Sequence, residues 1–337
     1  MNISTQIFNQ LLIMMGIAVI GFLFAKLTKA NDAEQKFLSK MLLYFINPCV
    51  IFTSFNVDFN VQKLYGLIFS AILSFIITFI MIGLAELIFH KNTSRQKIQK
   101  IAIVFTNCGF IGIPLINSVF GSEGVFYLMG YLISFNVMLW IYGYFQMCGK
   151  MNPVKIITNP NVLAVILGVI VFCLPFKLPS FIAKPLTMIG STNTAMSMIL
   201  LGVLFGSLKK EWLVKLYKTG ISIFTREQAY REGRKKIASI LITSFVRLIL
   251  CGLFSMGVVM LTVFLSSKFF PDADKNLVLL VCNIVFIASL CPAAVSVSSF
   301  ACLFDKDAVF ANFLVCFTHV LCIITVPLNL RIIEYVL

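Results

Sequence analysis

Two stretches of the chain combine residues that interrupt helices with side chains that donate hydrogen bonds. They contain Asn107, Gly109, Gly112 and Pro114 in the first stretch, and Pro292 and Ser296 in the second. Proline removes a backbone donor and glycine lowers helix stability, so each stretch predicts an interrupted helix. A helix that begins after an interruption presents free N–H groups with partial positive charge. Two such ends that converge form a binding site for an anion.

Three further polar residues fall within apolar stretches and are candidates for coupling or gating. His319 is titratable and could act as a proton-linked switch, or it could be a neutral imidazole hydrogen-bonded between helices. Arg247 could attract anions at mid-membrane, extend its head group toward the cytoplasm, or pair with Glu86. Asn47, together with Asn193, hydroxyls and backbone carbonyls, could hold a sodium ion.

The composition indicates the environment of these residues. Of 337 residues, 60% are hydrophobic and 12% are charged, with a mean hydropathy of +0.99. A soluble domain carries roughly twice that share of charge. Several apolar stretches exceed the roughly 20 residues that span a bilayer, so the chain is predicted to be an all-α polytopic membrane protein. This excludes most soluble enzymes, and an outer-membrane barrel, whose strands would alternate polar and apolar residues.

Ten stretches are long and apolar enough to be spans. They are residues 5–25, 37–56, 64–89, 99–120, 124–147, 158–175, 182–207, 238–266, 276–303 and 308–332. We divide them into two sets of five, residues 1–150 and 151–337. Because five is odd, the two halves lie in the membrane with opposite orientations, as in transporters built from inverted repeats, whose site lies between the repeats near mid-membrane. The two interrupted stretches are the fourth span of each half.

The net charge of +14 fits this topology. With the N-terminus outside, 20 of the 27 Lys and Arg residues fall in cytoplasmic loops, Lys100 included, and six fall outside. This is the positive-inside bias, so we expect no nucleic-acid partner. The first span lacks a cleavage pattern and is predicted to be retained, with both termini outside the inner, or plasma, membrane. The basic loop 208–236 is cytoplasmic, either lying on lipid headgroups as an amphipathic helix or solvated.

Metal, cofactor and enzyme chemistry find little support. The ten cysteines form no CxxC pair and the chain has two histidines, so we expect no metal, no disulfide framework and no cofactor. The Asp and Glu residues can all be placed in loops or near span ends, which disfavours an antiporter with a buried carboxylate pair. An intramembrane enzyme would need paired acids, a metal cluster or a Ser/His dyad, so we expect no enzyme.

The first interrupted stretch, residues 107–115 followed by Phe120 and Gly121, resembles the fourth-span signature of the auxin efflux carrier family and its bacterial permeases. Further similarities cover essentially the whole chain and lie at Asn47-Pro48, Met198 to Gly202, Pro292 and Thr325 to Leu328. In gross fold the family is similar to bile-acid symporters and sodium/proton antiporters. Asn136 stands at a polar position that plant carriers of the family use near their substrate.

The resemblance implies ten helices with the fourth and ninth spans crossed. It implies a scaffold of spans one, two, six and seven, which usually dimerises, and a moving domain of spans three to five and eight to ten. It also implies transport of organic anions, from indole-3-acetate in plants to malate- or malonate-like acids in bacteria. From the half-helix ends and the polar side chains at the breaks, and for Asn136 from the resemblance, we expect the substrate to contact Asn107, the Gly109–Gly112 backbone, Asn136 and Ser296, with Pro114 and Pro292 shaping the breaks.

The functional prediction is a secondary transporter of small carboxylates with an elevator-like mechanism. An anion that leaves a cell gains about 2.3 kcal/mol per 100 mV of inside-negative potential, so a carrier without a coupling ion should export. The alternative is a sodium- or proton-coupled uptake carrier for dicarboxylates or sterol-like acids. A membrane sensor that keeps the site but does not transport is the alternative from another class.

Overall fold

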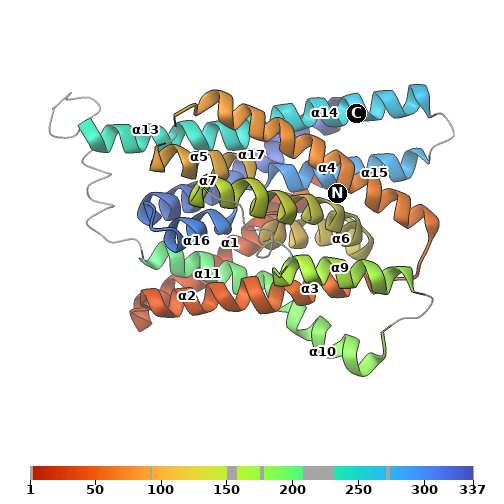
Figure 1. Cartoon of the computed structure of the whole chain (residues 1–337), viewed down its shortest axis with the longest axis horizontal. Helices are drawn as coiled ribbons and strands as arrows, with labels where there is room; N and C mark the ends of the chain where they lie inside the picture. Colours follow the sequence, from red (N-terminus) through yellow and green to blue (C-terminus); the bar gives the residue numbers. More distant parts are fainter. Residues whose placement is uncertain are drawn as a thin grey trace.

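The computed structural model describes residues 3–91, 93–149, 158–174, 178–207, 231–270 and 274–336. These residues form helices and connecting segments, and no β-strand occurs among them (Figure 1). The helices are α1 (Ile3–Thr28), α2 (Asp32–Met41), α3 (Asn47–Ser54), α4 (Val61–Ile88), α5 (Ser94–Val104), α6 (Ile113–Met138), α7 (Tyr144–Cys148), α9 (Pro160–Cys173), α10 (Ser180–Ser191), α11 (Asn193–Ser207), α13 (Arg231–Phe245), α14 (Cys251–Phe269), α15 (Lys275–Leu290), α16 (Val295–Leu303) and α17 (Ala308–Val336). Short π-helical segments join some of them, namely η1 (Leu42–Ile46), η2 (Cys108–Gly112), η3 (Leu139–Gly143) and η5 (Val246–Leu250).

Helices occupy all ten stretches that the sequence marks as spans. Among the described residues, seven helices are long and apolar enough to cross a membrane by length and composition. Helix α9 has 14 residues, α5 before the first break has 11, and α15 before the second break has 16, so these helices are shorter than a continuous span. The chain is thus a helical, multi-pass membrane protein, while the ten-span topology and the sides of the termini stay predictions.

The longest of the seven, Cys108–Cys148, is not one continuous helix. Gly121, inside α6, has φ 62° and ψ −159°, a conformation that is essentially restricted to glycine. It separates residues 113–120 from residues 122–138. This interruption falls in the gap between the predicted fourth and fifth spans, residues 99–120 and 124–147.

The outward faces of the long helices are apolar. Large hydrophobic side chains such as Ile20 on α1, Phe79 on α4 and Phe264 on α14 are exposed by 64%, 58% and 59%. Because one helix after another exposes such residues, these faces fit a lipid environment better than water.

Glycine allows α1 and α11 to pack closely against each other. A Cβ on Gly21 of α1 would lie 2.6 Å from the carbonyl oxygen of Ile199 on α11, so only a hydrogen side chain fits there. Helix α3 packs on α9 and α10, while α4 packs on α6 and α14 on α15. In Figure 1, α2, α3, α9 and α10 lie along the lower side of the view and α4, α13 and α14 along the upper side, with α5, α6, α7 and α16 between them.

The predicted basic loop needs one correction. Residues 208–230 lie outside the described residues, so the amphipathic-helix hypothesis for this segment is untested. Residues 231–236, which we assigned to the loop, form the first turns of α13. Lys236 in these turns pairs with Asp307 at 3.2 Å, a contact between distant segments that helps to hold the helix there.

Candidate functional site

Both predicted interruptions are present, and they meet. Helix α5 ends at Val104 and the chain is non-helical through residues 105–107 before η2 and α6 begin. Helix α15 ends at Leu290 and residues 291–294 are non-helical before α16 begins. Thr106 and Ala293 form an antiparallel β-bridge between the two segments. Two backbone hydrogen bonds flank it, from the Asn107 N–H to Pro292 O (2.7 Å) and from the Ala294 N–H to Phe105 O (2.9 Å).

This pairing explains how extended backbone persists inside a membrane protein. A backbone N–H or C=O that faces lipid without a partner costs several kcal/mol, so irregular backbone is tolerated only where other protein groups satisfy it. Each break supplies the hydrogen-bond partners of the other. We call the paired segments 105–107 and 291–294, with the first turns of the helices that follow them, the crossing.

The first break lies earlier in the chain than predicted. We expected Gly109, Gly112 and Pro114 to interrupt the helix, but all three are helical, the glycines within η2 and Pro114 in the first turn of α6. Proline is tolerated in a first turn, where its missing N–H is of little consequence. Gly112 has a packing role, because a Cβ there would lie 3.3 Å from the Cβ of Cys108 and 3.5 Å from the Sγ of Cys291.

Asn107 and His319, predicted as separate candidates, form one buried pair. The Asn107 Nδ2 lies 2.8 Å from the His319 Nε2, and the His319 Nδ1 lies 2.7 Å from the Val315 carbonyl oxygen. A carbonyl oxygen only accepts, so Nδ1 carries the proton and Nε2 accepts a hydrogen bond from the Asn107 amide. Both residues are at most 3% exposed. The imidazole is therefore neutral and fully paired in this arrangement.

The adjacent residue, Thr318, anchors the other break. Its Oγ1 accepts a hydrogen bond from the Ala293 N–H at 3.3 Å and donates to the Val315 carbonyl at 2.8 Å. Helix α17 thus contacts both breaks through two consecutive residues. Thr318 was not among the predicted site residues, and no local sequence pattern indicated that it would hold a backbone N–H.

Arg247 neither extends to the cytoplasm nor pairs with Glu86. It is 1% exposed, and its guanidinium donates to carbonyl oxygens of both interrupted helices. The acceptors are Ile103 O (2.8 Å from Nη1), Cys291 O (3.2 Å from Nε and 2.9 Å from Nη2) and Ser289 O. These carbonyls lie at the C-terminal ends of α5 and α15, where partial negative charge accumulates.

Two asparagines of other helices lie beside Gly109 of η2, namely Asn193 and Asn47, and Asn47 in turn contacts Asn161. The Asn193 Nδ2, on α11, donates to Gly109 O at 3.2 Å, and the Asn47 Nδ2, on α3, donates to the Asn161 Oδ1 of α9 at 3.2 Å. The Oδ1 atoms of Asn47 and Asn193 are buried and have no hydrogen-bond partner among the described residues. Asn161 was not among the predicted site residues.

Two predicted contacts stay untested by this geometry. Asn136 is buried, and its Nδ2 donates to Leu132 O one turn earlier in its own helix at 2.8 Å. Ser296 lies in the first turn of α16, is 7% exposed, and its Oγ has no hydrogen-bond partner among the described residues. An unpaired buried hydroxyl next to a break is available to a ligand, whereas the Asn136 amide already donates to a carbonyl of its own helix.

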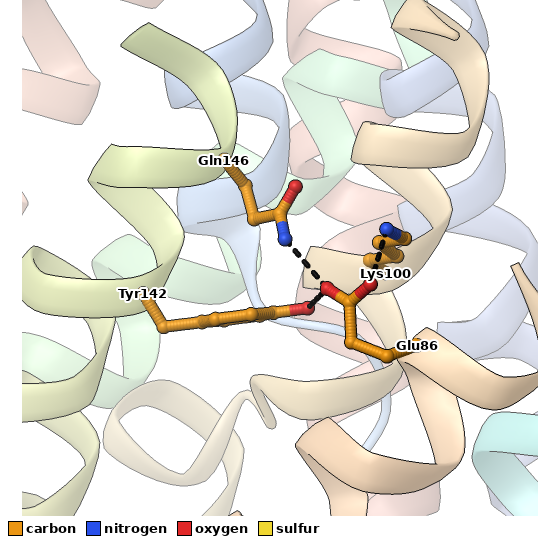
Figure 2. Close-up of polar contacts among 4 residues, drawn as sticks. All are labelled: Glu86, Lys100, Tyr142 and Gln146. Carbon is orange, nitrogen blue, oxygen red and sulfur yellow. Dashed lines mark hydrogen bonds and ion pairs between the residues drawn. The ribbon is translucent and has the colours of Figure 1, made fainter. Parts of the chain in front are cut away.

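A charged network surrounds Glu86 of α4 and includes Lys100 of α5, the helix that leads into the first break (Figure 2). The Glu86 carboxylate accepts from the Lys100 Nζ at 2.5 Å, from the Tyr142 hydroxyl at 2.7 Å and from the Gln146 Nε2 at 2.6 Å. The Lys100 side chain is 1% exposed and that of Glu86 is 41% exposed. Lys100, which the charge pattern placed in a loop, is therefore a buried residue of α5. The network ties α4, α5 and α7 together.

The described residues hold no group of three His, Cys, Asp or Glu side chains that could bind a metal ion. All ten cysteines lie in the described part of the chain and are free thiols. Seven of them are buried, which agrees with a packing role.

Comparison with known proteins shows which family this chain belongs to. The model of the family described as membrane transport protein matches residues 6–152 and 145–330. A search of curated proteins finds no match. The two matched stretches together cover nearly the whole chain, including both breaks, Arg247 and His319. The chain is therefore a multi-pass membrane transporter that belongs to the membrane transport protein family, the family of the auxin efflux carriers.

Proposed function

We propose that the crossing binds a small organic anion, a carboxylate, and that the chain exports it. The observation that carries the proposal is the pairing of residues 105–107 with 291–294, which brings the beginnings of two helical segments to one place inside the protein. Free N–H groups at both beginnings favour a negatively charged guest. Asn107 and Ser296 add an amide and a hydroxyl at the breaks.

The movement we propose is an elevator-like sliding of α4–α7 and α13–α17 against α1–α3 and α9–α11. The close packing of α1 on α11 through Gly21, and of α3 on α9 and α10, supports a rigid scaffold. The Asn193 hydrogen bond to Gly109 O joins that scaffold to the crossing. A single neutral hydrogen bond contributes about 1 kcal/mol, so it can be exchanged during such a movement.

The second candidate is cation-coupled uptake by the same fold. The buried Oδ1 atoms of Asn47 and Asn193 favour it, because unpaired amide oxygens are the ligands that a hard cation prefers. We rank export first because the potential alone drives an anion outward. The sensor alternative has no observation in its favour among the described residues.

The test is efflux from proteoliposomes of the full chain loaded with a carboxylate panel, with the corresponding amides as neutral probes. We expect acids to leave faster than amides and faster than from protein-free liposomes. Asn107→Ala should lower the acid rate about tenfold, since it removes a donor at the break and unpairs a buried histidine.

Asn136→Ala is the matched comparison, because the Asn136 amide is bonded within its own helix. We expect a smaller effect, about threefold or less. Equal efflux of acids and amides would contradict the proposed function. Equal rates in wild type and Asn107→Ala would remove Asn107 from the site without affecting the rest.

A further inference from the structure

Arg247 is a buried cation whose partners are backbone carbonyls. Its Nε, Nη1 and Nη2 atoms make four hydrogen bonds to the three carbonyls of Ile103, Ser289 and Cys291, which uses most of the five N–H groups of a guanidinium. The ion pairs formed by described residues near the crossing include Lys100 with Glu86, and none includes Arg247. The guanidinium therefore has little capacity left to touch a ligand directly.

The fold keeps this side chain in one place. Arg247 lies in η5, a π-helical turn, and such turns leave backbone carbonyls without their usual helical partner. Asn329 of α17 donates its Nδ2 to the Leu248 carbonyl at 3.3 Å, beside Gly252, where a Cβ would lie 3.0 Å from the Asn329 Oδ1. The backbone around Arg247 is thus supported by α17, the helix that also contacts both breaks.

The charge balance of the crossing depends on Arg247. The ends of α5 and α15 each carry roughly half a negative charge, and the beginnings of the two following helical segments each carry roughly half a positive charge. Without a cation these four ends sum to about zero, and an anion at the two positive ends would also meet the two negative ones. The guanidinium charge offsets the negative ends and leaves the crossing electropositive.

We infer that Arg247 is a positioning residue that sets the charge selectivity of the crossing without touching the anion. This rests on the proposed function, because it assigns a residue to the anion site proposed there. A structural cap would bind carbonyls through any donor, whereas charge selectivity needs a positive charge. The two roles therefore differ in how affinity depends on the charge of the ligand.

The test measures binding to the purified full chain of three probes of similar size, malonate, monomethyl malonate and malonamide, which carry two, one and no negative charges at neutral pH. In wild type, affinity should rise with ligand charge. Arg247→Gln keeps hydrogen-bond donors but removes the charge, and it should lower malonate affinity on the order of tenfold with little change for malonamide. Arg247→Lys should retain the dependence on ligand charge.

A second pair of variants keeps Arg247 in place, in case its replacement prevents folding. Cys251 is buried one helical turn after Arg247. Cys251→Asp adds a negative charge beside the guanidinium and should weaken the dependence of binding affinity on ligand charge. Cys251→Asn, which is isosteric with the Asp variant but neutral, should leave that dependence unchanged. Each variant is first checked for a monodisperse elution profile.

The outcomes separate the two claims. If wild type does not prefer the charged probes, the proposed function fails, and the role of Arg247 fails with it. If wild type prefers them and folded Arg247→Gln or Cys251→Asp keeps the full preference, the role of Arg247 is overturned and the anion site stands. Equal losses in the Gln and Lys variants for all three probes would likewise reduce Arg247 to a structural cap.

Discussion

Glu86 shows how one carboxylate can organise a membrane-embedded region. It accepts hydrogen bonds from Lys100, Tyr142 and Gln146, which belong to three different helical segments (Figure 2). Lys100 is fully enclosed, and a buried ammonium is stable only when opposite charge and acceptors lie beside it. The network therefore stabilises the helix that leads into the first break.

Replacement of Glu86 by glutamine tests this role. The Glu86→Gln variant would leave Lys100 facing a neutral amide, so we expect the free energy of unfolding to fall by about 1–3 kcal/mol, less than for a fully buried pair because Glu86 is half-exposed. Thermal unfolding in detergent measures the change. Tyr142→Phe, which removes one hydrogen bond and no charge, should cost about 1 kcal/mol or less. A Glu86→Gln variant as stable as wild type would show that the pair contributes nothing.

At the level of single residues, residue type predicted polar side chains within the spans, while their roles in binding stay predictions. Asn107 and His319 were recognised from polarity within apolar stretches, and both lie at the crossing. Their contact with each other was not predictable, because it joins residues 212 positions apart. The contacts of Lys100 and Arg247 were not predictable either. The charge pattern placed Lys100 in a loop, and the acceptors of Arg247 are backbone carbonyls that no side-chain pattern reveals.

At the level of elements, glycine and proline predicted that two helices are interrupted but not where. Pro292 lies in its break, whereas Gly109, Gly112 and Pro114 lie after theirs. Local helix propensity gives the cost of continuing a helix, while the position of a break depends on which backbone groups find partners across the crossing. Residues 105–107 pair with 291–294, so tertiary contacts decide the position.

The packing of α1 on α11 gives a test with a matched control on one helix. Gly21→Ala places a methyl group within 2.6 Å of Ile199 O, so we expect a loss of about 1–3 kcal/mol in the free energy of unfolding. A Cβ added at Gly16 would meet no atom within 4 Å, so Gly16→Ala should be neutral or stabilising by up to about 1 kcal/mol. Thermal unfolding of both variants measures the difference, and equal stability would contradict the close packing.

At the level of the whole molecule, composition was sufficient for the class of protein. Apolar stretches and sparse charge predicted helices in a membrane, and helices occupy all ten stretches. Span counting from helix length is less reliable here, because seven helices among the described residues qualify, whereas the shorter helices α5, α9, α15 and α16 do not. The inverted repeats and the homodimer through α1–α3 and α9–α11 remain proposals, since neither follows from the contacts of one chain.

The direction of transport follows from the membrane potential. At 100 mV, inside negative, a monoanion gains about 2.3 kcal/mol on leaving, roughly a fiftyfold outward bias. We expect malonate efflux from proteoliposomes to increase with an imposed inside-negative potential and to be unaffected by a sodium or proton gradient. Accumulation of malonate driven by either gradient would favour the coupled uptake carrier, with Asn47 and Asn193 as the first residues to replace.

The location of the anion is the most direct test of the proposed site. An experimental structure of the full chain with bound 4-bromobenzoate would place the ligand by the anomalous scattering of bromine. We expect its carboxylate at the crossing, within hydrogen-bond distance of Asn107 or Ser296 and facing the first turns that begin at Cys108 and Val295. A carboxylate bound away from residues 105–107 and 291–294, with those segments still paired to each other, would contradict the anion site.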